Sequence, residues 1–495
     1  MLLLGLDLGT SSIKASVVDG ATGQLVASAQ YPETENTIDS PEAGWAEQDP
    51  EMWWNCVQQA ILRCNDSGKY NPKEIRAIGI AYQMHGLVMV DRNLSVLRPS
   101  IIWCDSRAVA IGNKAFDAIG QSKCLTHLLN SPGNFTASKL AWVKENEPKV
   151  YGSVYKIMLP GDFVGMKLTG SITTSNSALS EGIFWDFQTN DVSEDILSYY
   201  GFPKTILPEI KPVFSNHGEL SSSIADLLGL KAGIPLTYKA GDQPNNALSL
   251  NVLDPGEVAA TAGTSGVIYS VSDQVSFDPQ SRVNTFAHVN HQLNNQNRLG
   301  TLLCINGTGI LNRWVRDNVA AGMSYGAMNQ HAASVTAGAE GLHILPFGNG
   351  AERVLSNQTI GSIFSGINFN VHTSAHIIRA AQEGIAFSLK YGMDIMAENG
   401  TKPAVIRAGK ANMFLSDVFS QALVNVTGVA VELYDTDGSK GAALGAGIGV
   451  NYFSTPKEAF SNMEKIGIIE PEQALSAQYQ EVYAGWAAVL GEALK

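Results

Sequence analysis

A short segment near the N-terminus, Asp7-Leu8-Gly9-Thr10-Ser11-Ser12, combines a carboxylate with small and hydroxyl-bearing residues. Small residues let a backbone approach a phosphate closely, and exposed N–H groups and hydroxyls supply neutral hydrogen-bond donors. Asp7 could hold Mg²⁺ directly or through water, because hard cations prefer carboxylate oxygen. The segment is not a Walker A loop, since the GxxxxGK[ST] pattern is absent. For a single segment of this kind, an ordinary tight turn is the better interpretation.

This segment has a second copy later in the chain. Gly9–Asp19 aligns without gaps with Gly263–Asp273, and six of the eleven positions are identical. Each copy follows a strand-like run, Leu2–Leu8 or Glu257–Ala262, and leads into another, which predicts a β-hairpin with a Gly-Thr-Ser turn. Chance similarity between two hairpins of common composition is the alternative. If the repeat is real, the two loops form a facing pair that could clamp a triphosphate from both sides.

A second carboxylate with possible chemistry lies in Ala240-Gly241-Asp242-Gln243-Pro244. Asp242 precedes Pro244 as residues do at the start of a helix. There an aspartate can cap the helix by accepting backbone N–H bonds. It can also act as a general base, because a carboxylate beside a helix N-terminus stays ionised and can accept a proton from a hydroxyl that attacks phosphorus. The two roles are compatible.

Three further segments place polar or aromatic groups at the ends of predicted strands. Gln83-Met84-His85-Gly86 follows an apolar strand, where side chains can enter a cleft, although a lone histidine is more often a satisfied structural residue. Ile101–Arg107 offers Trp103 beside a carboxylate and a guanidinium, which suit a polyhydroxylated ligand or a buried ion pair. Ile406–Asn412 reads as a strand and a small-residue turn before a helix, a geometry that can seat a nucleotide.

The elements that would position these residues indicate an α/β protein of two domains. With 495 residues the chain is too long for one hydrophobic core, and the repeat divides it into 1–250 and 251–495. Alternating strands and helices indicate mixed sheets covered by helices, with a ligand-binding cleft between the two domains. The predicted strands are Ala77–Ala81, Val88–Val90 and Ile101–Trp103, and the predicted helices are Pro50–Arg63, Ala137–Lys144, Ile377–Glu398 and Phe414–Val426.

Charge and composition exclude several classes of function. The net charge of −13 argues against binding to nucleic acid or to an anionic membrane. The apolar start is interrupted by Asp7 and has no basic region, so no signal peptide is expected, and no apolar run reaches the roughly 18 residues of a membrane span. The five cysteines form no CxxC pair with partner histidines, which indicates neither a disulfide framework nor a zinc site. We therefore expect a soluble cytoplasmic protein.

Taken together, these segments resemble the FGGY family of carbohydrate kinases, within the actin–hexokinase–Hsp70 superfamily. The matches are collinear from residue 1 to about 450, and Gly361–Ile367, His376 and Ala380–Phe387 are similar to the family's C-terminal signature. The resemblance implies two ribonuclease H-like domains with a cleft between them. It also implies that ATP, Mg²⁺ and a small sugar are the ligands. Dimers are common in the family, so a homodimer is compatible with the resemblance.

Within the family the chain is most similar to the xylulokinases, on the basis of Met84-His85-Gly86, Trp45–Pro50, Arg98-Pro99 and Gly263–Gly266. The resemblance implies ATP-dependent phosphorylation of a small ketose such as xylulose. It implies the following roles: Asp242 as the catalytic base; Met84, His85, Gln243 and Trp103 at the sugar; Asp7 at the metal; Gly9, Thr10, Ser11, Gly263 and Thr264 at the phosphates; and Gly309, Gly409 and Asn412 at the nucleotide.

Two departures leave the substrate open. Gln243 replaces the asparagine usual in xylulokinases, as in glycerol kinases, and Ala408–Ala411 replaces the family's Gly-Gly-Gly-Ala adenine loop, with Asn412 again like glycerol kinases. The Arg-Glu-rich motif expected in a glycerol kinase is absent. A kinase for glycerol, ribulose or rhamnulose is therefore the first alternative. A non-enzymatic nucleotide-dependent protein resembling actin or Hsp70 is a more distant one, against which Asp242 and Met84-His85 argue.

Overall fold

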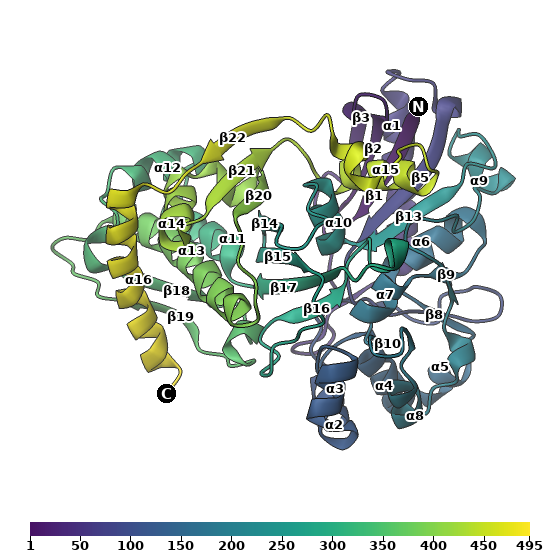
Figure 1. Cartoon of the computed structure of the whole chain (residues 1–495), viewed down its shortest axis with the longest axis horizontal. Helices are drawn as coiled ribbons and strands as arrows, with labels where there is room; N and C mark the ends of the chain where they lie inside the picture. The colour runs from purple at the N-terminus through teal and green to yellow at the C-terminus, as the bar shows by residue number, and fades with distance from the viewer.

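The computed structural model describes residues 1–495 as two mixed α/β halves (Figure 1). The N-terminal half is built on a five-stranded sheet with the order β13-β5-β1-β2-β3. Strands β5 and β13 run parallel to β1, whereas β2 and β3 form an antiparallel meander with it. Their bounds are β1 Leu2–Leu8, β2 Ile13–Asp19, β3 Gln24–Tyr31, β5 Ile75–Tyr82 and β13 Leu236–Gly241.

The C-terminal half is built on a seven-stranded sheet with the order β16-β17-β15-β14-β20-β21-β22. Its central strands repeat the first sheet in order and direction: β14, β15 and β17 are antiparallel neighbours, and β20 and β21 run parallel to β14. The internal repeat predicted from the sequence is thereby confirmed. The bounds are β14 Val258–Ala262, β15 Gly266–Ser272, β16 Asn284–Ala287, β17 Leu299–Ile305, β20 Val405–Gly409, β21 Ala430–Tyr434 and β22 Lys465–Ile469.

Strand β1 is apolar along its length because both faces of the sheet are covered. Leu4, Leu6 and Leu8 face the core under α1 (Pro50–Asp66), whose first turn is capped by Asp49. The opposite face carries Leu3, Gly5 and Asp7, since alternate residues of a strand point to the same side. This face is covered by α15 (Gly438–Gly449), which comes from the far end of the sequence.

Helix α15 packs against the N-terminal sheet almost backbone to backbone. A Cβ atom built on Gly5 would lie 1.9 Å from the Ser439 carbonyl oxygen, and one on Gly79 would lie 2.0 Å from that of Ala442. In Figure 1, α15 lies beside β1 and β5, whereas the strand before it, β21, belongs to the other half. Helix α10 (Asp242–Ser249) follows β13 as α15 follows β21, and the two helices pack against each other.

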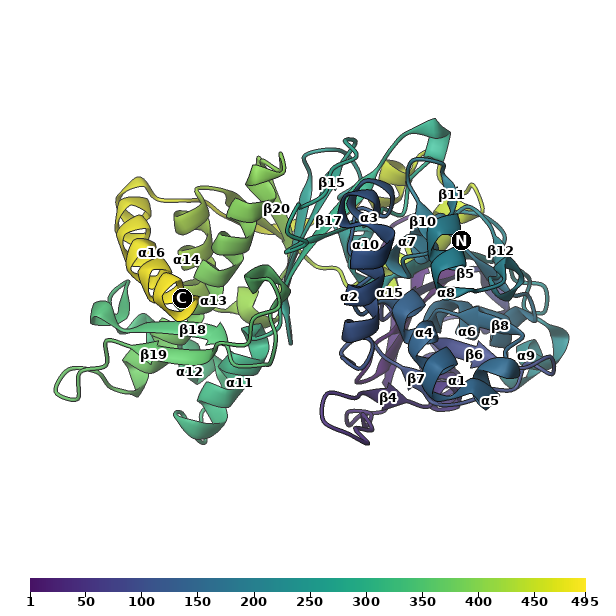
Figure 2. The same cartoon turned by 90° about the horizontal axis from the view of Figure 1, so that it is seen from below.

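The remaining helices cover the outer faces, and two bodies are distinct in Figure 2. None of the helices combines the length and the apolar character needed to cross a bilayer. In the N-terminal half they are α2 Val109–Ile119, α3 Gln121–His127, α4 Thr136–Asn146, α5 Pro148–Gly152, α6 Pro160–Thr169, α7 Asn176–Glu181, α8 Glu194–Tyr200 and α9 Ser222–Leu227. In the C-terminal half they are α11 Thr308–Asn318, α12 Tyr325–Ala333, α13 Ser374–Glu398, α14 Asp417–Thr427 and α16 Gln473–Ala493.

Two predicted elements need correction. The helix predicted over Phe414–Val426 begins only at Asp417, because Ser416 caps it by accepting a hydrogen bond from the Phe419 N–H at 3.3 Å. The strand predicted over Ile101–Trp103 is β7, Ser100–Ile101. It ends there because the Asp105 N–H donates to the Ile102 carbonyl and closes a turn, which leaves the Trp103 side chain 39% exposed.

Candidate active site

The first predicted phosphate loop closes the β1–β2 hairpin, with Leu8 paired to Ile13. Two of the segments singled out from the sequence meet at Thr10. Its hydroxyl accepts a hydrogen bond from Trp103 Nε1 at 3.0 Å and donates one to Gln83 Oε1 at 3.2 Å. The structure therefore brings Trp103 and the segment before Met84 to the rim of this loop, while Ser11 remains exposed.

The second loop closes the β14–β15 hairpin, with Ala262 paired to Gly266. The Gly309 N–H, at the start of α11, donates to the Thr264 carbonyl at 3.0 Å. A Cβ atom on Gly309 would lie 2.1 Å from the Gly263 carbonyl oxygen, and one on Gly263 would lie 3.4 Å from Asn412 Nδ2. Gly263, Thr264, Gly309 and Asn412 therefore lie together, as the sequence predicts for a nucleotide site, and Gly409 ends the adjacent strand β20.

Asp242 is the first residue of α10, and Gly241 occupies the N-cap position. The Asp242 carboxylate accepts hydrogen bonds from the backbone and side chain of Gln243, so it meets free N–H groups of the first turn from one position inside the helix. Burial, and then the neighbouring Asp7 carboxylate, raise the pKa of Asp242 to about 7. Burial, and then Asp437, raise the pKa of Asp7 to about 6, with Lys14 acting in the opposite direction. The Asp7 carboxylate thus lies within electrostatic reach of Asp242 where the N-terminal strands end.

Asp437 connects the two halves at this point. It caps α15 by accepting a hydrogen bond from the Lys440 N–H at 2.9 Å, and the Lys14 ammonium from β2 lies 2.5 Å from its Oδ2. Burial acts against ionisation, but the hydrogen bond and charge of Lys14 outweigh it and lower the pKa of Asp437. Because Asp7 lies on the face covered by α15, it is adjacent to this helix start, where a Cβ on Gly438 would lie 2.3 Å from Asp7 Oδ2.

His85 is held in a conformation that few residues adopt. Its φ is 62°, its N–H donates to Glu181 Oε2 at 3.0 Å, and its Nδ1 lies 2.9 Å from the Glu181 carbonyl oxygen. Burial, and then the Lys139 charge, lower its pKa to about 3, so the ring is neutral. Because a carbonyl can only accept, Nδ1 carries the proton. Nε2, which has no partner within the protein, is then free to accept a hydrogen bond from a hydroxyl.

Two charged residues at this site were not identified from the sequence. Lys139 on α4 is fully buried, and its ammonium donates to the carbonyls of His85 and Ile102, both at 2.9 Å. Glu181 on α7 accepts from Tyr82 Oη at 2.8 Å and holds the His85 backbone. A Cβ on Gly241 would lie 2.7 Å from Met84 Cγ and 3.2 Å from Glu181 Oε1, so both flank the start of α10. The signal available in the sequence for Lys139 was a lysine among the apolar residues of the predicted helix Ala137–Lys144.

The carboxylates also indicate which residues could hold a metal ion. No group of three or more histidine, cysteine, aspartate or glutamate side chains forms a protein-only metal site. Mg²⁺ is commonly bound by one or two carboxylates together with substrate phosphates and water. Asp7 and Asp242 fit that pattern, because each is half-buried near another carboxylate, and a divalent cation would favour the ionised forms against the burial and repulsion that raise their pKa values.

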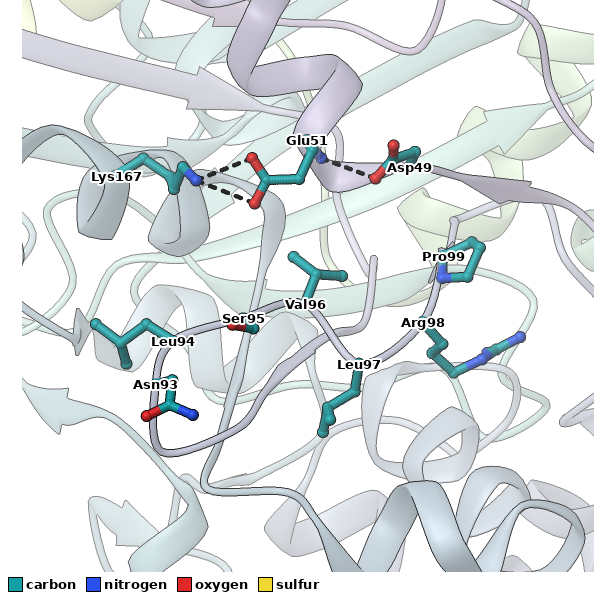
Figure 3. A pocket seen from close by; sticks show the side chains of 10 residues that line it. All are labelled: Asp49, Glu51, Asn93, Leu94, Ser95, Val96, Leu97, Arg98, Pro99 and Lys167. Carbon is teal, nitrogen blue, oxygen red and sulfur yellow. Dashed lines mark hydrogen bonds and ion pairs between the residues drawn. The ribbon is translucent and has the colours of Figure 1, made fainter.

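An open groove of about 680 Å³ lies elsewhere on the N-terminal half (Figure 3). It passes the start of α1, where Lys167 pairs with Glu51 at 2.9 Å. None of the residues predicted for catalysis or binding lines it. The candidate active site is therefore assigned to the residues around Asp7 and Asp242 and not to this groove.

Comparison with known proteins agrees with this architecture. The fold is that of the two-domain sugar kinases in the actin–hexokinase-like superfamily, with paired hairpin loops and a carboxylate at the start of a connecting helix. The family model for the N-terminal domain of the FGGY family of carbohydrate kinases matches residues 2–249, and the model for its C-terminal domain matches residues 258–450. The chain belongs to the FGGY family of carbohydrate kinases.

Several relatives are similar over most of their length. The xylulose kinase of Escherichia coli is 29% identical over 451 residues, which cover 90% of this chain and 88% of that protein. The crystal structure of xylulose kinase from Rhodospirillum rubrum is 25% identical, with a TM-score of 0.87 over 99% of both chains. The Plasmodium falciparum glycerol kinase structure with ADP has a TM-score of 0.87 over 100% of this chain and 98% of that one at 20% identity, a likeness of fold alone.

Proposed function

We propose that this protein phosphorylates D-xylulose with ATP, giving D-xylulose 5-phosphate and ADP, with Asp242 as the general base. The observation that carries the proposal is the position of Asp242. It begins α10 beside Met84 and Glu181, and it also interacts electrostatically with Asp7 at the end of the strand that precedes the first loop. Similarity to xylulose kinases over most of the chain supports the choice of sugar.

The acceptor would bind in the N-terminal domain, residues 1–250. His85 Nε2 accepts a hydrogen bond from a sugar hydroxyl, since the neutral ring has its proton on Nδ1. Met84 contributes an apolar contact and Gln243 a hydrogen-bond donor, while Trp103, whose indole N–H already donates to Thr10, contributes its aromatic face. Glu181 and Lys139 hold the His85 backbone from either side and so fix the direction of its ring.

The nucleotide would bind mainly in the C-terminal domain, residues 251–495. Gly263, Thr264, Gly309, Gly409 and Asn412 receive the nucleotide, and the first loop, Gly9–Ser11, faces its terminal phosphates. Backbone N–H groups of glycine-rich turns are suited to phosphate oxygens. Asp7 would hold Mg²⁺, which supplies charge neutralisation on the phosphates when bound.

The transfer step conserves atoms and charge. The acceptor oxygen forms a bond to the γ-phosphorus as the bond from that phosphorus to the β,γ-bridging oxygen breaks, and ADP leaves. Asp242 accepts the proton of the attacking hydroxyl. A carboxylate whose pKa is near the working pH can both exist ionised and take up a proton readily.

Steady-state ADP release with Mg·ATP, across xylulose, ribulose, rhamnulose and glycerol, tests the proposal. Xylulose should give the highest kcat/KM, and Asp242→Asn should lower kcat by roughly 10²- to 10⁴-fold, the contribution typical of a positioned general base. Asp254→Asn is the matched control, because Asp254 lies on the surface after α10 and pairs with Lys457. Unchanged turnover in Asp242→Asn would remove that residue from the base role.

A glycerol kinase is the second candidate, because Gln243 and Asn412 follow the pattern of that branch. If glycerol gives the higher kcat/KM, the family assignment stands and the choice of xylulose is wrong. In that case Gln243→Asn should shift the preference toward the ketose. ADP release that needs no acceptor at all would instead favour a nucleotide-dependent binding protein.

A further inference from the structure

Arg353 is a guanidinium without a protein partner at the boundary between the two domains. It begins a short 3₁₀ turn, Arg353–Leu355, in the C-terminal domain. Its Cζ lies 5.1 Å from the centre of the Phe135 ring, which belongs to the N-terminal domain. None of its N–H groups makes a hydrogen bond or ion pair within the protein, although arginine carries five such donors and no acceptor.

The turn that carries Arg353 is firmly held. The preceding residue, Glu352, is fully buried, and both of its carboxylate oxygens lie 3.1 Å from the Asn306 backbone nitrogen. The following residues, Val354 and Leu355, are 1% and 3% exposed in the core of the C-terminal domain. The backbone at Arg353 is therefore fixed on both sides, and its side chain is directed toward Phe135.

The surroundings of the guanidinium are those of the acceptor site. Phe135, over which it lies, packs edge to face against the His85 ring, with 4.8 Å between ring centroids. The Arg353 charge also contributes to keeping His85 neutral, and it acts on Cys304, which in turn is close enough to Asp242 to feel its charge. Arg353 thus lies over Phe135 beside His85, and Cys304, on which its charge acts, also hydrogen-bonds to Ser265 of the second loop.

Arg353 is half-buried, and a partly buried cation without a carboxylate or carbonyl partner is poorly compensated unless water or a ligand supplies acceptor atoms. Burial lowers the pKa of Arg353. Elsewhere in the chain, the buried arginines are paired: Arg107 with Asp105 and Glu47, and Arg379 with Glu383. Arg353 is arranged to meet acceptor atoms that the protein itself does not provide.

We propose that Arg353 is a specificity-determining residue for the acceptor, donating hydrogen bonds from the C-terminal domain to oxygen atoms of the polyhydroxylated substrate bound at His85. The inference rests on the proposed kinase function, but not on xylulose being the sugar. It assigns to the C-terminal domain a direct contact with the acceptor. Acceptor binding then draws the two domains together, because the ligand is held by His85 on one side and Arg353 on the other.

The test compares Arg353→Met, Arg353→Lys and the control Arg92→Met, using whichever acceptor the wild-type enzyme phosphorylates best. Arg92 is matched because it also lies over an aromatic ring, with Cζ 5.4 Å from the centre of Tyr155, without an ion pair. Arg353→Met should raise KM for the acceptor at least tenfold and leave KM for ATP within twofold. Arg353→Lys should recover little, because an ammonium cannot reproduce the planar fork of donors.

Thermal unfolding separates this role from a structural one. Since Arg353 has no hydrogen-bond or ion-pair partner to lose, and methionine can keep the packing on the Phe135 ring, Arg353→Met should unfold at the wild-type temperature or above it. An acceptor KM within twofold of wild type in Arg353→Met, or a rise in KM for ATP in its place, would overturn the inference. If the wild-type enzyme phosphorylates no acceptor, the proposed kinase function is wrong. That outcome differs from an unchanged acceptor KM in Arg353→Met, which would contradict only the role of Arg353.

Discussion

At the scale of single residues, the burial that raises the pKa of Asp242 to about 7 predicts the pH dependence of the reaction. Asp242 must be ionised to accept a proton, so activity is lost as pH falls through its pKa. We expect kcat/KM for the ketose to be level above pH 7 and to fall by up to tenfold per pH unit below it. A profile that stays flat between pH 8 and pH 5.5 would contradict Asp242 as the titrating base.

The same burial predicts that Asp242 destabilises the ligand-free enzyme. Its pKa in the folded protein lies above the ordinary 3.8, so ionisation is harder in the folded state than in the unfolded chain. The penalty is fully present above pH 7 and disappears as pH falls toward 4. Asp242→Asn should therefore unfold several degrees above wild type at pH 8, with the difference shrinking at pH 5. Equal melting temperatures at both pH values would speak against a buried, ionised Asp242.

His85 allows a prediction about binding. Replacing it by asparagine keeps a residue that tolerates φ near 62° but removes the Nε2 acceptor. We expect KM for the ketose to rise roughly tenfold or more in His85→Asn, the cost of about one good hydrogen bond, with little change in KM for ATP. Isothermal titration with the sugar alone measures the same loss without turnover, and unaltered sugar affinity would exclude the contact.

Some residues of the site could be predicted from the sequence and others could not, for physical reasons. Asp7, Thr10 and Asp242 stand in short segments whose small residues and strand ends reveal their position. Glu181 and Arg353 stand in segments without such a pattern, and each reaches the site through tertiary packing far from its neighbours in the chain. The role of Glu181 depends on the partners that it finds and that of Arg353 on the partners that it lacks, and both become apparent only once burial and hydrogen bonds are known.

At the scale of elements, the hairpins were predictable because their strands are apolar and their turns small, whereas the position of α15 was not. Its glycines, Gly438, Gly441 and Gly445, give no strong helical pattern in the sequence. These glycines let the backbone of α15 pack closely against the sheet, and this packing determines where the helix lies. The repeat in the sequence covers the hairpins alone, so it did not reveal that α10 and α15 occupy equivalent places and pack against each other.

The backbone contact under α15 predicts a large effect from one methyl group. In Gly79→Ala the new Cβ would lie 2.0 Å from the Ala442 carbonyl oxygen, and neither backbone can easily move. The free energy of unfolding should fall by roughly 1–3 kcal/mol or more, as in other overpacked cores. Chemical denaturation measures it, with Gly491→Ala as control because nothing lies within 4 Å of that position. A loss no larger than that of the control would mean that α15 can shift.

At the scale of the whole molecule, the proposed site draws residues from both domains, so we expect the domains to approach each other when both ligands bind. We expect the radius of gyration, measured by small-angle X-ray scattering, to fall when the ketose and a non-hydrolysable ATP analogue are both present, and less with either alone. Arg353→Met should close incompletely under the same conditions. Scattering curves that are identical with and without both ligands would indicate that closure does not accompany binding.

The position of α15 also has a consequence for how the protein is made. The face of the first sheet that carries Leu3, Gly5 and Ala77 is covered by residues 438–449, about 200 residues after the last strand of that sheet. At a synthesis rate of about 5–20 residues per second, the ribosome needs roughly 10–40 s to supply them. During that interval the nascent first domain exposes an apolar surface that only the end of the chain can cover. The first domain can therefore complete its folding only late in synthesis, after α15 has been made.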